Sequence, residues 1–168
     1  MGGVAPAGPP RSDDRAVGNP WGHAGIVGRQ LAAWAALSVV AGIVLIGVAN
    51  ALAADAAAVT LRAVALQFVV WGAIDGLIAA AGERDRRRRL ARGEDRDPAA
   101  TRAFGARLRR LLRLNAGLDV GYLAVGLALW LLWRTPEGLG HGLGVLIQGG
   151  FLLAFDAWHG WRPAPGAD

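Results

Sequence analysis

The chain contains no cysteine and no lysine, and it has one methionine and one tyrosine among its 168 residues. Without cysteine there are no disulfides, no thiolate metal sites and no thiol catalysis. All 18 basic residues are arginine. This bias, together with many alanines and glycines, indicates a GC-rich bacterial coding sequence rather than a functional requirement. Charged residues make up only 18% of the chain, hydrophobic residues make up 54%, and the mean hydropathy is +0.34. These values are unusual for a soluble domain.

Long apolar runs separate a few charged blocks. Four runs are distinguished, at residues 31–54, 63–82, 114–133 and 143–160. A bilayer core of about 30 Å is crossed by about 20 helical residues, so we predict an all-α protein with a four-transmembrane-helix bundle over residues 25–161. A glycine-rich segment, 138–144, is expected to connect the last two spans. Residues 1–24 are expected to form a disordered cytoplasmic tail and residues 162–168 a short one.

The first apolar run has an alternative interpretation as a secretory signal. Its end, Ala51-Leu52-Ala53, resembles the small-residue site at which signal peptides are cleaved. The apolar part of a signal is about 15 residues long at most, however, and this run is longer and follows a polar leader. We therefore expect a retained span.

The arginines predict the orientation of the bundle. Residues 83–113 carry twelve arginines and five acidic residues, a net charge of +7. Loops rich in arginine stay cytoplasmic, so we expect this loop and both termini to lie on the cytoplasmic side of a bacterial inner membrane. Sixteen arginines are then cytoplasmic, and only Arg62 and Arg134 lie on the other side.

The arginine-rich loop also contains a helical pattern. Phe104, Leu108, Leu111 and Leu112 recur at helical spacing between arginines, which is typical of a basic amphipathic helix on a membrane surface. The simplest interpretation is that these arginines fix topology. The alternative is binding of anionic lipid headgroups, with candidates Arg107, Arg109 and Arg110. The expected partner is the lipid bilayer and not nucleic acid, because the basic block lies between two spans and lacks stacking aromatics.

Polar residues inside the apolar runs form one stripe on each of the last three helices. The candidate polar-core residues are Gln67, Asp75, Asn115, Asp119, Gln148 and Asp156. Within each helix they are spaced by one or two turns and share a face. The three aspartates lie about 5 to 8 Å to the cytoplasmic side of their span centres at a rise of 1.5 Å per residue, so converging stripes would form a carboxylate cluster. The candidate counter-charges are Arg29, Arg113 and His159.

The same spacing suggests an internal repeat. A shift of 81 residues places Gln67 on Gln148 and Asp75 on Asp156. Such a repeat predicts two tandem helical hairpins related by an axis along the membrane normal.

Three stretches, Gln67–Asp75, Leu114–Tyr122 and Gln148–Asp156, resemble an uncharacterised family of small bacterial four-helix membrane proteins. The resemblance covers roughly residues 25 to 160. The family pattern has asparagine where this chain has Ser38. The resemblance implies a shared four-helix membrane fold and adds no activity.

Function is less constrained than fold. One interpretation is that the polar residues are interhelical hydrogen bonds in a membrane protein whose biochemical role is unassigned. A second is a proton- or cation-coupled transporter or channel subunit, for which four helices would have to assemble into a homo-oligomer. A third is a membrane-embedded partner or regulatory subunit. A membrane enzyme using carboxylates with His141 or His159 is a further alternative, but HExxH, GxSxG and a glycine-rich loop ending in lysine are all missing from the sequence. We therefore expect no enzyme, no cofactor and no metal site.

Overall fold

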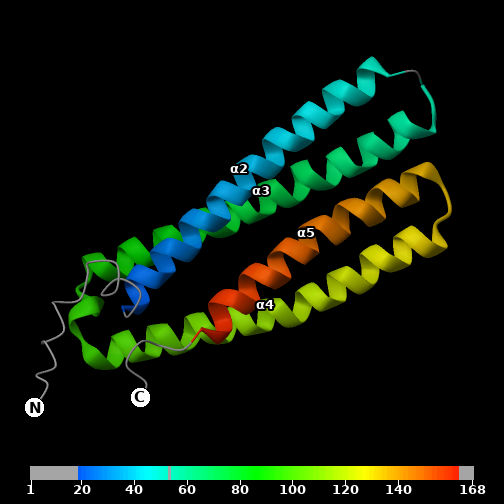
Figure 1. Ribbon diagram of the computed structural model, residues 1–168. Helices are drawn as coiled ribbons and strands as arrows, with labels where there is room; N and C mark the ends of the chain where they lie inside the picture. Colours follow the sequence, from blue (N-terminus) through cyan, green and yellow to red (C-terminus); the bar gives the residue numbers. More distant parts are fainter. Residues whose placement is uncertain (1–18, 53, 163–168) are drawn as a thin grey trace, which may run out of the picture.

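The structure, a computed structural model, describes residues 19–52 and 54–162. These residues form four long α-helices and one short 3-10 helix, and the described segments contain no strand. The helices are α2 (Pro20–Ala51), α3 (Ala56–Ala91), α4 (Pro98–Leu132) and α5 (Pro136–Trp161), with η1 (Glu94–Arg96) between α3 and α4 (Figure 1). The predicted all-α architecture with four helices is confirmed.

Local sequence sets where the helices begin. Each of the four follows a polar residue whose side chain accepts a hydrogen bond from a backbone N–H group of the first turn, and three have proline at their start. Both features are favoured there because the first N–H groups of a helix have no intrahelical partner. The caps are Asn19, Asp55, Asp97 and Thr135, and the prolines are Pro20, Pro98 and Pro136.

All four helices are long and apolar enough to cross a membrane. Their outer faces carry large apolar side chains, and Leu77 and Leu132 are 73% and 80% exposed. A protein in water rarely leaves extended apolar surface uncovered. The length of the helices and the character of their outer faces are compatible with a bundle surrounded by lipid.

The helices form two antiparallel hairpins, α2–α3 and α4–α5, which pack together with α3 beside α5 (Figure 1). Helices α2 and α4 also meet, at the end where the α3–α4 connection lies. There the Trp21 ring stacks on Phe104 with 4.0 Å between centroids, and Trp21 Nε1 donates to Thr101 Oγ1 at 3.1 Å. The tandem-hairpin arrangement expected from the sequence is the one observed.

Glycines allow the helices of each hairpin to approach closely. In α5, a Cβ atom on Gly142 would lie 2.7 Å from the backbone nitrogen of Trp130. In α3, a Cβ atom on Gly72 would lie 2.9 Å from the backbone oxygen of Ala35. Small residues at such contacts are typical of helices packed in a membrane, where close backbone contact takes the place of hydrophobic burial.

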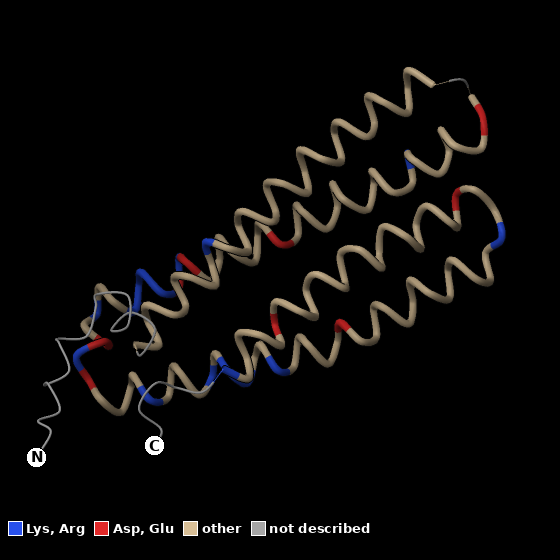
Figure 2. The backbone as a smooth tube through the Cα atoms, viewed as in Figure 1, with Lys and Arg blue, Asp and Glu red and all other residues tan. Residues whose placement is uncertain are grey.

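The start of α2, the end of α5 and the α3–α4 connection all lie at one end of the bundle (Figure 1). Most of the arginines gather there (Figure 2), and we call it the arginine-rich end. The connection is short because Gly93 adopts φ = 73°, a left-handed conformation that glycine reaches without steric cost. The ion pairs of Glu94 with Arg89 and Arg92 hold this connection.

Several boundaries differ from those expected. Residues 20–24 belong to α2 rather than to a tail, and residues 1–18 and 163–168 lie outside the described part of the chain. The glycine-rich segment 138–144 is not a connection but the first turns of α5, because its glycines pack closely against neighbouring helices. The expected surface helix around Phe104 is part of α4, which runs without a break from Pro98. The helices therefore extend beyond the apolar runs at the arginine-rich end.

Candidate functional site

Three aspartates from three different helices lie together inside the bundle. Asp75 of α3, Asp119 of α4 and Asp156 of α5 are only 2%, 3% and 6% exposed. The carboxyl groups of Asp119 and Asp156 lie next to each other, and Asp75 is close enough to interact electrostatically with both. Two carboxyl groups can share a hydrogen bond only when one of them carries a proton. We call these three residues the carboxylate cluster.

The carboxylate cluster lacks a counter-charge. No ion pair joins any of its members to a basic residue within residues 19–52 and 54–162. The Oδ2 atoms of Asp75 and Asp119 are buried and have no hydrogen-bond partner. An uncompensated carboxylate inside a membrane costs at least about 2.5 kcal/mol, and buried polar groups are normally satisfied. The cluster is therefore suited to holding protons or a bound cation.

The donor set favours protons over a metal ion. Among the residues that the structure describes, no group of three or more histidine, cysteine or acidic side chains is arranged to hold a metal. The three aspartates are close enough to interact but do not converge on one coordination centre. Carboxyl groups that lie side by side can exchange protons, since each donates when protonated and accepts when ionised.

A layer of amide and aromatic side chains lies next to the cluster, on the side away from the arginine-rich end. Gln148 is fully buried; its Oε1 accepts from Trp34 Nε1 at 2.9 Å, and its Nε2 donates to Ser38 Oγ at 3.2 Å. Trp71 packs edge-on against Tyr122 with 4.9 Å between ring centroids. This layer joins α2 to α5 and α3 to α4, across the diagonals of the bundle.

Beyond that layer a second polar group leads to the opposite end of the bundle. Trp71 Nε1 donates to Gln67 Oε1 at 3.1 Å, and Gln67 Nε2 lies 2.9 Å from His141 Nδ1. The other ring nitrogen of His141 is 3.9 Å from a carboxylate oxygen of the exposed Glu137. Hydrogen-bonding groups therefore run from the surface at that end to the aromatic layer.

A third polar group lies between the cluster and the arginine-rich end. His159, one turn after Asp156, is 4% exposed, and its Nε2 is 2.8 Å from Gln30 Oε1. Its Nδ1 is buried and unpartnered within the described residues. The ring of His23, which is partly exposed, lies 5.2 Å from the His159 ring. These groups continue the line of polar side chains toward the surface.

The residues expected as counter-charges occupy other positions. Arg29 is exposed and lies beside Arg86 near Gly25. Arg113 donates through Nε to the backbone oxygen of Gly160 at 2.9 Å. His159 is one turn from Asp156 but pairs with Gln30. The cluster is thus left without a cationic neighbour among the described residues.

The other residues predicted from the sequence, Asn115, the three loop arginines and Gln67, lie in three different places. Asn115 is exposed at the bundle surface, and its side chain reaches Asp156. Arg109 and Arg110 line a groove together with Arg113, whereas Arg107 is exposed outside that groove. The sequence singled out Gln67 as a neighbour of Asp75, but its hydrogen-bond partners are His141 and Trp71.

Three participants were not singled out by the sequence. His23, Gln30 and Trp34 all lie on α2, which has no internal acidic residue to mark a polar stripe. Their spacing was the available signal: Gln30 and Trp34 are one helical turn apart, and His23 is two turns before Gln30.

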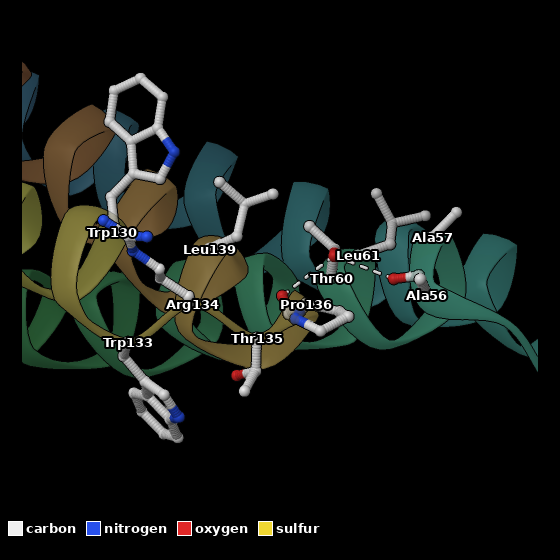
Figure 3. Close-up of a pocket in the computed structure, with 10 residues that line it drawn as sticks. All are labelled: Ala56, Ala57, Thr60, Leu61, Trp130, Trp133, Arg134, Thr135, Pro136 and Leu139. Carbon is white, nitrogen blue, oxygen red and sulfur yellow. Dashed lines mark hydrogen bonds between the residues drawn. The ribbon is translucent and has the colours of Figure 1, made fainter.

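An open pocket of about 550 Å³ lies at the end opposite the arginine-rich end, where the start of α3 meets the α4–α5 turn (Figure 3). The hydroxyl of Thr60 donates to the backbone oxygen of Pro136 at 2.9 Å across its floor. Trp133, in its wall, stacks on His141 with 5.9 Å between centroids. The pocket therefore lies beside His141, at the end of the bundle where the group of Gln67, His141 and Glu137 reaches the surface. Its lining residues are Ala56, Ala57, Thr60, Leu61, Trp130, Trp133, Arg134, Thr135, Pro136 and Leu139.

Comparison with known proteins identifies the family of this chain. No curated protein and no solved structure matches it. A family model described as a family of unknown function, DUF6992, matches residues 30–157, which include most of each of the four helices and the whole carboxylate cluster. The chain therefore belongs to the DUF6992 family of unknown function.

Proposed function

We propose that this protein is an integral membrane protein that conducts protons, or couples their movement to that of a small solute, through the carboxylate cluster. The observation that carries the proposal is the burial of Asp75, Asp119 and Asp156 without a counter-charge, with two of their oxygens unpartnered. Ionisable residues inside a membrane-spanning bundle are costly, and they commonly mark proton relays and ion pathways.

The proposal includes a location for the bundle, in the bacterial plasma membrane with its arginine-rich end in the cytoplasm. The support is the charge asymmetry: arginine-rich segments resist translocation, and both the α3–α4 connection and the start of α2 carry arginines at this end. In this orientation both termini are cytoplasmic, and the carboxylate cluster lies in the cytoplasmic half of the bundle.

The polar groups on either side of the cluster support a pathway. On the outer side Glu137, His141 and Gln67 lead inward as far as Trp71. On the cytoplasmic side His159 and His23 lead from the cluster to the surface. The layer between the outer group and the cluster then acts as the gate, because the Trp34 N–H, the Gln148 amide and the Ser38 hydroxyl are committed to one another and a proton can pass only when these hydrogen bonds rearrange.

A purely structural role accounts less well for the three acids. Interhelical hydrogen bonds in membranes are made well by serine, threonine, asparagine and glutamine, which carry no ionisable charge. Gln148 and Ser38 already fulfil that role in this bundle. The aspartates add a desolvation cost that bonding alone does not require.

The test is proton flux in proteoliposomes under an imposed potassium diffusion potential, followed with a pH-sensitive dye trapped inside. Wild-type protein is compared with Asp75→Asn, Asp119→Asn and Asp156→Asn. Asp95→Asn, an exposed residue of the connection, is the matched control. We expect flux in the wild type and in the control, and at least a tenfold loss in each cluster variant at equal incorporation and unchanged thermal stability.

Two outcomes would contradict the proposal. One is wild-type protein that passes no more protons than empty vesicles. The other is variants that lose stability but not flux per correctly folded molecule, since that pattern identifies the aspartates as structural.

A further inference from the structure

A groove on α4 gathers three arginines at the arginine-rich end. It encloses about 410 Å³ and is lined by Ala106, Arg109, Arg110, Arg113 and Leu114. Arg109 and Arg110 lie three and four residues after Ala106, and Arg113 and Leu114 lie four residues after these two, so all five share one face of the helix. Three guanidinium groups are thus held along a single stripe.

The arginines of this groove differ from those of α3 in their charge balance. On the α3 side, Glu83 pairs with Arg86 at 2.8 Å and with Arg87 at 2.6 Å. Asp85 and Glu94 likewise pair with arginines of α3 and of the connection. Hydrogen bonds from Arg92 and Arg89 lower the pKa of Glu94 below its ordinary value, so this acid remains ionised beside them. Three acids thus pair with Arg86, Arg87, Arg89 and Arg92, whereas Arg84 and Arg88 of α3 form no ion pair within the described residues.

No such pairing occurs on α4. Within the described part of the chain, none of the arginines on the first half of this helix forms an ion pair with an acidic residue. They are Arg102, Arg107, Arg109, Arg110 and Arg113. The five α4 arginines therefore carry positive charge that no acidic side chain of the described residues offsets, and this charge is available to an anion.

Two interactions hold the side chain of Arg113, which lines the groove, in place. Arg113 Nε donates to the backbone oxygen of Gly160, and its guanidinium carbon lies 5.6 Å from the centre of the Trp161 ring. Holding an arginine in advance reduces the conformational entropy lost on binding. The neighbouring Arg162 is held in a similar way over Trp158 at 4.5 Å and adds to the positive field.

The groove also lies where a membrane surface would be. Leu114 begins the apolar run of α4, and Leu111, Leu114 and Leu118 are all about half exposed on the outer face of the bundle. Exposed tryptophans at the end of α5, Trp158 and Trp161, lie at the same end, as interfacial aromatic belts do. The arginines therefore lie at headgroup depth, with apolar surface directly beside them.

We propose that this groove binds the phosphate of an anionic phospholipid of the cytoplasmic leaflet, with its acyl chains lying along Leu114 and Leu118. The guanidinium fork matches phosphate oxygens in geometry as well as in charge. The adjoining leucines favour a lipid over a free phosphate, because a soluble anion would gain nothing from them. This site is independent of the carboxylate cluster.

The test is native mass spectrometry of the delipidated full chain in detergent, titrated with dioleoyl phosphatidylglycerol or with dioleoyl phosphatidylcholine. We expect a saturable adduct with the anionic lipid. The triple variant Arg109→Gln/Arg110→Gln/Arg113→Gln should weaken it on the order of 100-fold, since each arginine near a membrane surface contributes a factor of about five. The matched control, Arg84→Gln/Arg87→Gln/Arg88→Gln, removes the same charge from α3 and should weaken it less than threefold.

The alternatives give distinct results. Equal loss in the two triple variants would overturn the site in favour of a diffuse field. Equal affinity for glycerol phosphate, which has no acyl chains, would overturn the lipid in favour of a soluble phosphate. Should the triple variant fold poorly, Arg110→Gln, an exposed position, is measured alone. An affinity unchanged by that substitution would also reject the site.

Discussion

The indole N–H of Trp34 donates a 2.9 Å hydrogen bond to Oε1 of Gln148, and this bond joins α2 to α5 across the interior of the bundle. The amide nitrogen of the same glutamine donates to Ser38 at 3.2 Å. Gln148 is fully buried, so both of its polar atoms are satisfied by the other hairpin. One buried side chain therefore contributes two of the hydrogen bonds that align the hairpins.

Replacing Gln148 with leucine should destabilise the protein. The substitution leaves Trp34 Nε1 and Ser38 Oγ without partners in the interior, and we expect a loss of about 1 to 2 kcal/mol in the free energy of unfolding. The measurement is unfolding in mixed detergent micelles, followed by tryptophan fluorescence. Ile147→Leu, at a neighbouring exposed position, serves as the control and should be neutral. A neutral Gln148→Leu would show that packing alone aligns the hairpins.

Two glycines of α5 should respond in opposite ways to alanine. A Cβ atom at Gly142 would lie 2.8 Å from the backbone oxygen of Gly126, whereas one at Gly150 meets nothing within 4 Å. Gly142→Ala should therefore cost about 1 to 3 kcal/mol through overpacking. Gly150→Ala should stabilise by roughly 0.5 to 1 kcal/mol, because alanine favours the helix. Thermal unfolding in detergent measures both. Equal effects at the two positions would contradict the close approach of α4 and α5.

The sequence was sufficient for the fold because its signals are local. Apolar runs of about 20 residues, each bounded by charges or caps, predict four helices, and one polar stripe on each of the last three predicts where the aspartates face. The structure brings Asp75, Asp119 and Asp156 together as that pattern indicates.

The parts that the sequence could not predict depend on contacts between helices. Residues 138–144 look like a flexible connection because glycine disfavours helix. The helix forms there because Gly142 allows the backbone of α5 to pack on that of α4. Gln67 shares a face with Asp75, yet it bonds to His141 because spacing along one helix does not show which neighbour lies at each depth.

The orientation proposed for the bundle can be tested by cysteine labelling, since the chain has no cysteine of its own. Single cysteines at Asp95 and Arg162, which are exposed at the arginine-rich end, and at Ala57 and Glu137, exposed at the other, are treated in whole cells with an impermeant maleimide. We expect labelling at Ala57 and Glu137 only, with the other two labelled after permeabilisation. The unmodified chain controls for background. Labelling of Asp95 and Glu137 from the same side would rule out the antiparallel membrane arrangement.

The α3–α4 connection should lose order in acid. Hydrogen bonds from Arg92 and Arg89 lower the pKa of Glu94 below its ordinary value of 4.5. Its ionised form therefore stabilises the connection fully above pH 4.5, and the contribution is lost as the pH falls through the lowered pKa. We expect the exchange protection factors of the Arg96 and Asp97 amides to be constant above pH 4.5 and to fall as the pH is lowered further, through the lowered pKa of Glu94. In Glu94→Gln they should be low throughout this range, and a pH response that persists in this variant would exclude Glu94 as its cause.

The last prediction concerns the contact between Asp119 and Asp156. If their carboxyl groups share a proton, asparagine at either position preserves the hydrogen bond and should change the free energy of unfolding by less than about 1 kcal/mol. Leucine at one position leaves the other acid unpaired and should cost about 1 to 3 kcal/mol. Leucine at both positions removes both polar groups. The double variant should therefore lose at least about 1 kcal/mol less free energy of unfolding than the two single variants lose in sum. Pairing Asp119→Leu with Glu137→Leu, at the opposite end of the bundle, supplies an additive control. Additivity in the Asp119–Asp156 cycle would mean that the two carboxyl groups do not interact, and the shared proton on which the proposed pathway relies would have to be abandoned.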